Sequence, residues 1–272
     1  MYRFTALRAL FLALLPLSAC ALDPMDPLEE GVDEDGSAIV RGDVDTLHPA
    51  VVAVVSRLGA CTGTLIEVRE DRGSVLTAAH CCPAFPRPQE VVFGVDCAPP
   101  PDSPYPAPVH YDVLPGSIQV DPRYDGRDHD FCLLQFSVAE APLLPAPIPL
   151  STPETDDLDV GDTVEILGYG ETEGDARNTL RRRVEVSIDA LDTISLRFGQ
   201  VAPEGGTCGG DSGGPALAGA AGAQRVAAVT WWGDPDCAQL GVSGRVAAAI
   251  EPFIAPYLRC RGPAPCDDVA CG

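Results

Sequence analysis

The sequence comprises 272 residues, 46% of them hydrophobic, which is enough to bury one large core or two small ones and argues against extensive disorder. Its 40 acidic and 18 basic residues give a net charge of −22, which argues against nucleic acid or an anionic membrane surface as an electrostatic partner. Eleven cysteines indicate an oxidising compartment rather than the cytosol.

The first 20 residues have the organisation of an export signal. Two arginines precede an apolar run, residues 9–17, that is too short to cross a bilayer as a helix. Residues 17–20 are similar to a bacterial lipobox, after which Cys20 would carry lipid, whereas residues 19–21 also fit ordinary signal cleavage. We predict an exported protein and favour a lipoprotein of the outer membrane or cell surface over plain secretion. Either route removes Cys20 from the disulfide count and leaves ten cysteines.

The next segment, residues 21–38, is acidic and rich in residues that break regular structure. A segment of this composition cannot bury enough apolar surface to fold by itself. We therefore predict a solvated tether or propeptide here, followed by one folded domain over residues 39–258 and a Cys- and Pro-rich tail over residues 259–272.

Short apolar stretches recur through the folded domain. They are β-branched and separated by turn residues, in a chain that holds 27 Gly and 27 Pro, and this pattern predicts an all-β barrel fold rather than βαβ units. The single helix that we expect covers residues 244–258, with Pro252 and Pro256 interrupting it. The expected strands are residues 51–55, 62–66, 91–93, 164–167, 184–188 and 226–232.

Three short motifs carry the residue types of nucleophilic catalysis. Ser212 lies in the glycine-rich stretch 209–215, where small residues let a substrate backbone come close. A serine hydroxyl needs a base within reach, and the base needs a third group to hold its tautomer. His80 ends one apolar run and Asp130 starts another, so both residue types are present in motifs of their own. The remaining histidines lie in no comparable motif and are expected to be exposed loop residues: His48, His110 and His129.

In the order His, Asp, Ser, these motifs resemble those of the trypsin/chymotrypsin family of serine endopeptidases, from Ile39 to about Leu258. The resemblance implies two six-stranded Greek-key barrels, divided within the Pro-rich residues 141–153, with the active site between them. It also implies hydrolysis of polypeptide substrates through an acyl-enzyme, with Ser212 as the nucleophile, His80 as its base and Asp130 as the group that holds the base. The N–H groups of Gly210 and Ser212 would form the oxyanion hole. No cofactor is expected.

Residues 39–42 resemble the start of a mature protease of this family, with Arg41 in place of a glycine. The resemblance implies a zymogen, in which an activating protease frees the Ile39 ammonium to pair with Asp211 and order the oxyanion hole. Because Ala38 rather than Arg or Lys precedes Ile39, a trypsin-like activator is not the expected cleaving enzyme.

The resemblance also places the substrate pocket, with Gly206 at its base and Trp232, Gly233 and Gly241 on its walls. Such a pocket has no fixed charge and suits a large apolar side chain, unless Asp234 or Asp236 leans in from the rim. One departure concerns the support of Asp130. Either Trp231 replaces the serine that normally donates to the triad acid, or Thr230 fills that role with the register shifted by one residue.

Cysteine pairing is implied in part by the same resemblance, which pairs Cys61 with Cys81 and Cys208 with Cys237. For the other six we expect Cys82 to pair with Cys97, and Cys132 with one of the C-terminal cysteines, which are Cys260, Cys266 and Cys271. We expect no metal: a zinc site would need Cys-x-x-Cys pairs, and the acidic stretch 121–130 lacks the spacing of an EF-hand.

Two other classes of function stay open beside the enzyme. One is a catalytically silent protease homologue that acts as a binding protein. The other is a lipid-anchored structural protein whose disulfides matter more than its serine. The intact set of His80, Asp130 and Ser212 favours the enzyme over both.

Overall fold

The computed structural model describes residues 38–83, 86–138, 144–172 and 177–259. The export signal with Cys20, the acidic segment up to residue 37 and the tail from residue 260 lie outside these ranges and remain sequence predictions. Along the described ranges, no helix is both long and apolar enough to cross a membrane.

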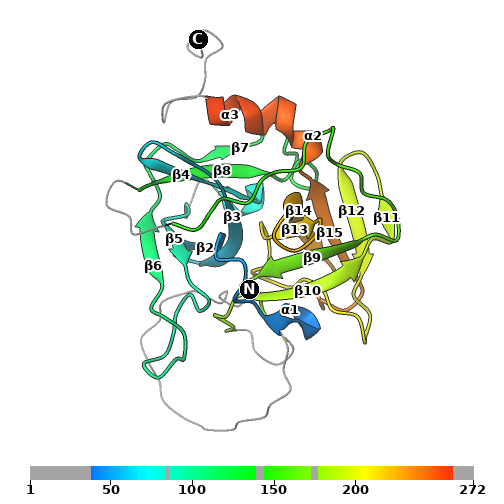
Figure 1. Cartoon of the computed structure of the whole chain (residues 1–272), viewed down its shortest axis with the longest axis horizontal. Helices are drawn as coiled ribbons and strands as arrows, with labels where there is room; N and C mark the ends of the chain where they lie inside the picture. The colour runs from blue at the N-terminus through cyan, green and yellow to red at the C-terminus, as the bar shows by residue number, and fades with distance from the viewer. Residues whose placement is uncertain (1–37, 84–85, 139–143, 173–176, 260–272) are drawn as a thin grey trace, which may run out of the picture.

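Two antiparallel sheets, which lie side by side in Figure 1, form the fold. The first has seven strands, in the order β6 (Val109–Asp112), β5 (Glu90–Phe93), β2 (Val51–Ser56), β3 (Gly59–Arg69), β4 (Arg72–Thr77), β8 (Cys132–Ser137) and β7 (Gln119–Val120). The second has eight, in the order β1 (Asp43–Val44), β10 (Arg182–Ser187), β9 (Thr163–Gly168), β13 (Pro215–Ala218), β14 (Arg225–Gly233), β15 (Leu240–Arg245), β12 (Ser195–Gly199) and β11 (Ala190–Leu191). Without the two-residue strands each sheet has six, so the expected all-β fold is confirmed.

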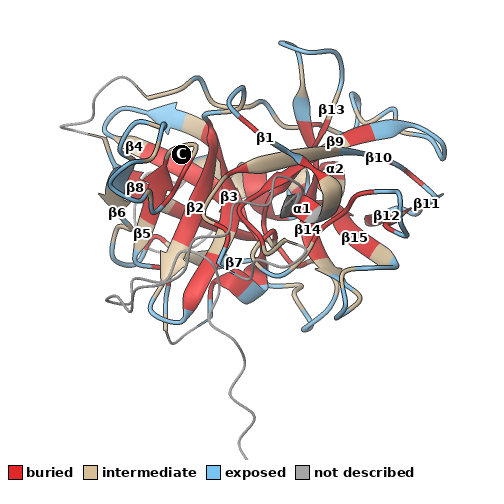
Figure 2. Ribbon diagram, turned by 90° about the horizontal axis from the view of Figure 1, so that it is seen from below, coloured by how far each residue is buried: buried red, intermediate tan, exposed pale blue. Residues whose placement is uncertain are grey.

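The central strands are buried on both faces, which explains their nearly continuous apolar sequences. Successive side chains of a strand point to opposite faces. In β2, Val52 and Val54 therefore enter the core of the first sheet, while Val51 and Ala53 enter a cluster between the two sheets. Figure 2 shows the same arrangement, with buried residues following the strands and exposed residues at the loops.

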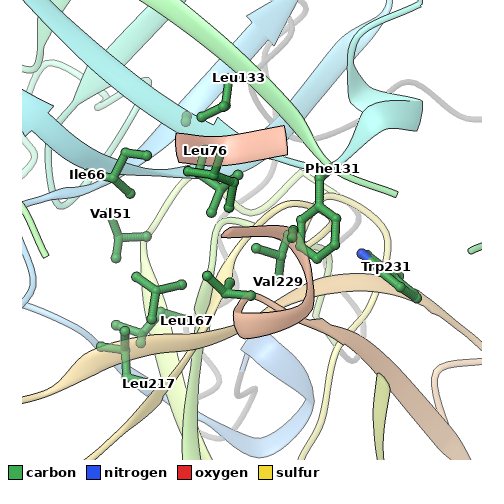
Figure 3. Close-up of a cluster of buried hydrophobic side chains, with 14 of the residues drawn as sticks. Val51, Ile66, Leu76, Phe131, Leu133, Leu167, Leu217, Val229 and Trp231 are labelled. Atoms are coloured by element: carbon green, nitrogen blue, oxygen red, sulfur yellow. The ribbon is translucent and has the colours of Figure 1, made fainter. Parts of the chain in front are cut away.

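The cluster between the sheets joins them into one unit. Figure 3 shows Leu76 and Leu133 from the first sheet close to Leu167, Leu217 and Val229 from the second, all buried. Burial of such side chains stabilises by about 1.5–3 kcal/mol each. This shared core holds together the edges at which the candidate catalytic residues lie.

The C-terminal helical segment begins later than we predicted, at Ala247, because Gly244 belongs to β15. It runs through α2 (Ala247–Ala249), a π-helical turn η2 (Ile250–Ile254) and α3 (Ala255–Arg259), so the regular α-helix is interrupted around Pro252 while the backbone stays helical. Pro252 lies in the wider turn and Pro256 in the first turn of α3, where a missing N–H costs little. Phe253 and Ile254 anchor the segment in the shared core. Two further short helical pieces precede it, α1 (Ala38–Arg41) and the 3₁₀ turn η1 (Ala79–Cys81).

Disulfides brace the turn that carries His80. Cys61–Cys81 and Cys208–Cys237 are present, as the family resemblance implied. The predicted partners of Cys82 and Cys132 are wrong, because these two cysteines pair with each other. The reason is the sheet register: Thr77 at the end of β4 lies opposite Cys132, which brings the following η1 turn beside β8. Cys97 is disulfide-bonded as well, but not to Cys82.

A buried ionic network crosses from the N-terminal segment to the second sheet. Arg181 and Asp45 are both fully buried and form an ion pair of 2.8 Å. Arg181 also donates to the carbonyls of Val51 and Gly94. Burial by itself would raise the pKa of Asp45, but the hydrogen bond from His48 and the charge and hydrogen bond of Arg181 hold that pKa well below its usual value.

His48 belongs to this network and is not the exposed loop residue that we expected. Its Nδ1 lies 2.8 Å from Asp45 and its Nε2 lies 2.9 Å from the side-chain oxygen of Gln224. Both partners are acceptors, so both ring nitrogens donate and the imidazolium is favoured. Burial lowers the pKa of His48, but the hydrogen bonds to Asp45 and Gln224 and the charges of Asp45 and Glu165 outweigh it, so the net pKa is raised.

This raised pKa predicts a pH-dependent stability. A group with a higher pKa in the folded than in the unfolded state stabilises the fold below its unfolded pKa, about 6.5, and loses that contribution as the pH rises through the folded value. We expect the melting temperature of the wild type to exceed that of His48→Gln by about 2–4 °C at pH 5.5, and by less at pH 9. Calorimetry across this range checks the prediction, and a gap independent of pH would contradict it.

Candidate active site

His80 and Asp130 meet where two paired strands end. β4 leads into η1, which carries His80, and Asp130 lies just before β8, the neighbour of β4. The buried carboxylate of Asp130 accepts the backbone N–H of His80 at 2.8 Å and lies 2.6 Å from its Nδ1. These two contacts fix the ring and leave Nε2 as the nitrogen available to a third group.

Ser212 comes from the second sheet, in the turn that leads into β13. Strand β3 of the first sheet holds this turn, because Thr62 donates its N–H to the carbonyl of Ser212 and its hydroxyl to that of Gly210, both at 2.9 Å. Gly210 and Gly213 have positive φ angles of 95° and 84°. A Cβ on Gly213 would also lie 2.0 Å from the hydroxyl of Thr77. Position 213 therefore requires glycine both for its φ angle and for lack of space.

One open cavity of about 590 Å³ brings the three candidate catalytic residues together. His80 and Asp130 reach it from the first sheet and Ser212 from the second, and the rest of its wall comes from Tyr124, Gly126, Arg127, Trp231 and Trp232. The other histidines do not line it. His110 lies on β6 rather than in a loop, where it pairs with Glu90, and the half-buried His129 has a φ of 55°.

The backbone N–H groups of Gly210 and Ser212 belong to the turn that carries Ser212. In the part of the chain that the structure describes, neither group donates to a protein acceptor, whereas the N–H groups of Asp211, Gly213 and Gly214 all do. N–H groups without a protein acceptor are available to stabilise a developing oxyanion.

Asp211 is fully buried beside Ser212. Its carboxylate accepts the N–H groups of Gly170 and Cys208 at 2.8 and 2.9 Å. Burial raises the pKa of Asp211 to about 7; the two hydrogen bonds oppose this rise and the charge of Glu171 adds to it. No hydrogen bond or ion pair joins it to Ile39 within the described residues, and the Ile39 side chain instead packs in the core of the second sheet.

A comparison with known protein families gives a match over most of the chain. A family model described as Trypsin matches residues 39–254, which include both sheets and most of the C-terminal helical segment. The chain belongs to the trypsin family. Among curated proteins no significant match to it is found. The trypsin family consists of serine proteases acting on polypeptides, and disulfide-bonded domains of this type are typically extracellular.

Next to Ser212, this trypsin-family domain has a second cavity, of about 230 Å³, which we term the Cys208 pocket. Trp232 and Gly233 form part of its wall, as expected, whereas Gly206 and Gly241 do not line it. A Cβ on Gly206 would lie 2.2 Å from the side chain of Gln200, and one on Gly241 would lie 2.2 Å from the Phe198 ring. The two glycines thus make room for side chains that our sequence analysis missed.

Asp234 lines the Cys208 pocket, so one carboxylate reaches the pocket for which we expected no fixed charge. Its carboxylate is occupied by its own turn, where it accepts the N–H groups of Ala238, Gln239 and Leu240 at 2.7–3.0 Å. Burial by itself would raise the pKa of Asp234, but these three hydrogen bonds together outweigh it and hold that pKa below its usual value. The charge is therefore tied to the backbone of this turn.

Neither Thr230 nor Trp231 donates to Asp130. The Thr230 hydroxyl and the Trp231 indole nitrogen are both buried and have no hydrogen-bond partner among the described residues. A bulge in β14 places Trp231 over Gly244, where a Cβ would lie 1.9 Å from the indole ring. Trp231 also packs edge-on against Phe131, the neighbour of Asp130, at 5.4 Å between ring centroids (Figure 3). In place of a hydrogen bond from β14, the segment that carries Asp130 is held by the packing of Trp231 against Phe131.

Among the described residues, one group of side chains near this site has the composition of a metal site. Potential ligand atoms of Cys61, His80 and Cys81 lie within 4.8 Å of one another, but the two sulfurs form a disulfide. In the acidic stretch, Asp121 pairs with Arg123 at 2.6 Å and Asp125 accepts two backbone N–H groups. These side chains serve the loop that leads to Asp130.

Proposed function

We propose that the protein is a serine endopeptidase in which Ser212 is the nucleophile, His80 the general base and Asp130 the residue that orients the base. The observation that carries this proposal is the contact of 2.6 Å between His80 Nδ1 and buried Asp130, in a cavity that Ser212 shares. A carboxylate on Nδ1 holds the tautomer in which Nε2 is free to accept a proton.

The reaction follows from these positions. The Oγ of Ser212 attacks the carbonyl carbon of the scissile peptide while its proton moves to Nε2 of His80. The N–H groups of Gly210 and Ser212 stabilise the oxyanion that forms, an effect of about 3–4 kcal/mol per donor. His80 then returns the proton to the leaving amine, and a water molecule, deprotonated by the same nitrogen, hydrolyses the acyl-enzyme.

We further propose that the protein is made as a zymogen. Asp211 is buried without a cationic partner among the described residues, and its pKa near 7 reflects the cost of that charge. Cleavage before Ile39 would supply an ammonium group, and pairing with Asp211 would relieve this cost next to the oxyanion turn. To pair with Asp211, Ile39 would have to leave the core of the second sheet.

A tagged fluorophosphonate tests the proposed function, since only an activated serine reacts with it. We expect labelling of Ser212 in protein cleaved before Ile39, weaker labelling in the uncut protein, and none in Ser212→Ala. A silent homologue used for binding, or a structural protein, would stay unlabelled after the same cleavage.

The Cys208 pocket predicts which residue is preferred immediately before the scissile bond. Its wall is formed by Trp232, Gly233 and the Cys208–Cys237 disulfide, and its one carboxylate is held by backbone N–H groups. We expect large apolar residues to be preferred here. Peptide-library profiling of the active enzyme measures this, and a strict requirement for Arg or Lys would show that Asp234 dominates the pocket instead.

A further inference from the structure

A positive charge lies over the aromatic wall of the catalytic cavity. The guanidinium carbon of Arg127 is 4.8 Å from the ring centroid of Trp232, a cation–π contact. Arg127 lines the same cavity as His80 and Ser212. In a chain with a net charge of −22, an arginine at this position calls for an explanation.

The loop that carries Arg127 holds it in place without neutralising it. Asp125 accepts the backbone N–H groups of Arg127 and Asp128, at 3.0 and 2.8 Å, and so stabilises the turn rather than the guanidinium. Arg123 on the same loop pairs with Asp121. Arg127, by contrast, makes no ion pair with any residue in the described ranges. Its side chain is exposed, so its N–H groups are accessible from the cavity.

The two cavities beside Ser212 have different chemistry and share one wall. Ser212 and Trp232 line both, so Trp232 lies between the Cys208 pocket and the cavity that holds Arg127. Side chains of an extended peptide alternate between opposite directions. When the residue before the scissile bond enters the Cys208 pocket, the second or fourth residue before that bond points to the other side of Trp232.

We infer that Arg127, stacked on Trp232, forms a second side-chain subsite that selects an acidic residue at the second or fourth position before the scissile bond. This rests on the proposed function. The flat guanidinium can bind a carboxylate through two N–H groups while its face stays on the indole ring. The alternative is that Arg127 only covers Trp232, in which case its charge would have no effect on substrate choice.

Charge reversal distinguishes these alternatives. We would compare kcat/KM for matched peptides with Glu, Gln or Lys at each of the four positions before the scissile bond. In the wild type, we expect Glu to be preferred over Gln roughly five- to tenfold at the second or fourth position. Arg127→Gln should abolish this ratio and Arg127→Glu should change the preference to Lys. Arg225→Gln, which removes an exposed charge outside both cavities, should retain the wild-type ratio.

Salt provides a second measurement. The Glu/Gln ratio should fall between about 0.1 M and about 1 M salt, over which the screening length shrinks from about 10 Å to about 3 Å. Wild-type enzyme that reacts with the fluorophosphonate but shows no acidic preference, or the same preference in Arg127→Gln, would overturn the subsite and leave the proposed function intact. Failure of the wild type to react would overturn the proposed function, and the subsite with it.

Discussion

Peptide hydrolysis by Ser212→Ala is expected to fall by roughly 10⁴-fold or more in kcat, with little change in KM, because the triad acts as a unit in the transition state. His80→Ala should cost about as much, and the double variant little more than either single one. The residual rate would come from substrate binding and from the N–H groups of Gly210 and Ser212. Steady-state kinetics on the cleaved, purified enzyme measures these effects.

His110→Ala provides the matched control for His80. His110 also contacts a carboxylate, Glu90, but it does so on the exposed strand β6. Its replacement should leave kcat within about twofold of the wild type, since exposed ion pairs of this kind contribute little. Near wild-type turnover by purified Ser212→Ala would contradict the proposed mechanism.

The largest effect on stability is expected from Arg181→Met. This change leaves the fully buried carboxylate of Asp45 without its main cation, and it removes one of the donors to the carbonyls of Val51 and Gly94, which keep only the shared hydroxyl of Tyr169 from this network. Breaking a buried ion pair in this way costs about 3–5 kcal/mol. Urea unfolding at pH 7 measures the loss. Because the pKa of Asp45 is lowered in the fold, the stabilisation from its pairing is present above the usual carboxyl pKa and is lost as the pH falls below it.

Arg183→Met is the control for lost charge and lost side-chain volume. The Arg183 guanidinium pairs with Glu165 at a half-exposed position, so its removal should cost less than about 1 kcal/mol. Adding Asp45→Asn to Arg181→Met should recover part of the loss, because no buried charge then remains. Equal destabilisation by the two arginine variants would show that the buried pair has no special role.

The candidate catalytic residues could be identified from sequence because each lies in a short local motif. A serine in a glycine-rich stretch, or a histidine that follows a strand, can be recognised in the sequence without knowing what packs beside it. The Cys82–Cys132 pair was predicted wrongly for the opposite reason, since it depends on the register between β4 and β8, whose residues are far apart in sequence. The C-terminal helix was misplaced at Gly244 because the packing of Trp231 on that glycine is a contact between strands.

By itself, the sequence determined the all-β class, the trypsin family and the pairs Cys61–Cys81 and Cys208–Cys237. The fold class depends on local composition, and the family on motifs whose order along the chain is visible. The two disulfide pairs followed from the resemblance that these motifs carry. Only the tertiary structure decided that His48 joins a buried ionic network, that Thr230 and Trp231 leave Asp130 without a further donor, and that Arg127 lies over Trp232. Each of these depends on which side chains from distant segments share a space, and burial and contact across the two sheets are set by the packed fold as a whole.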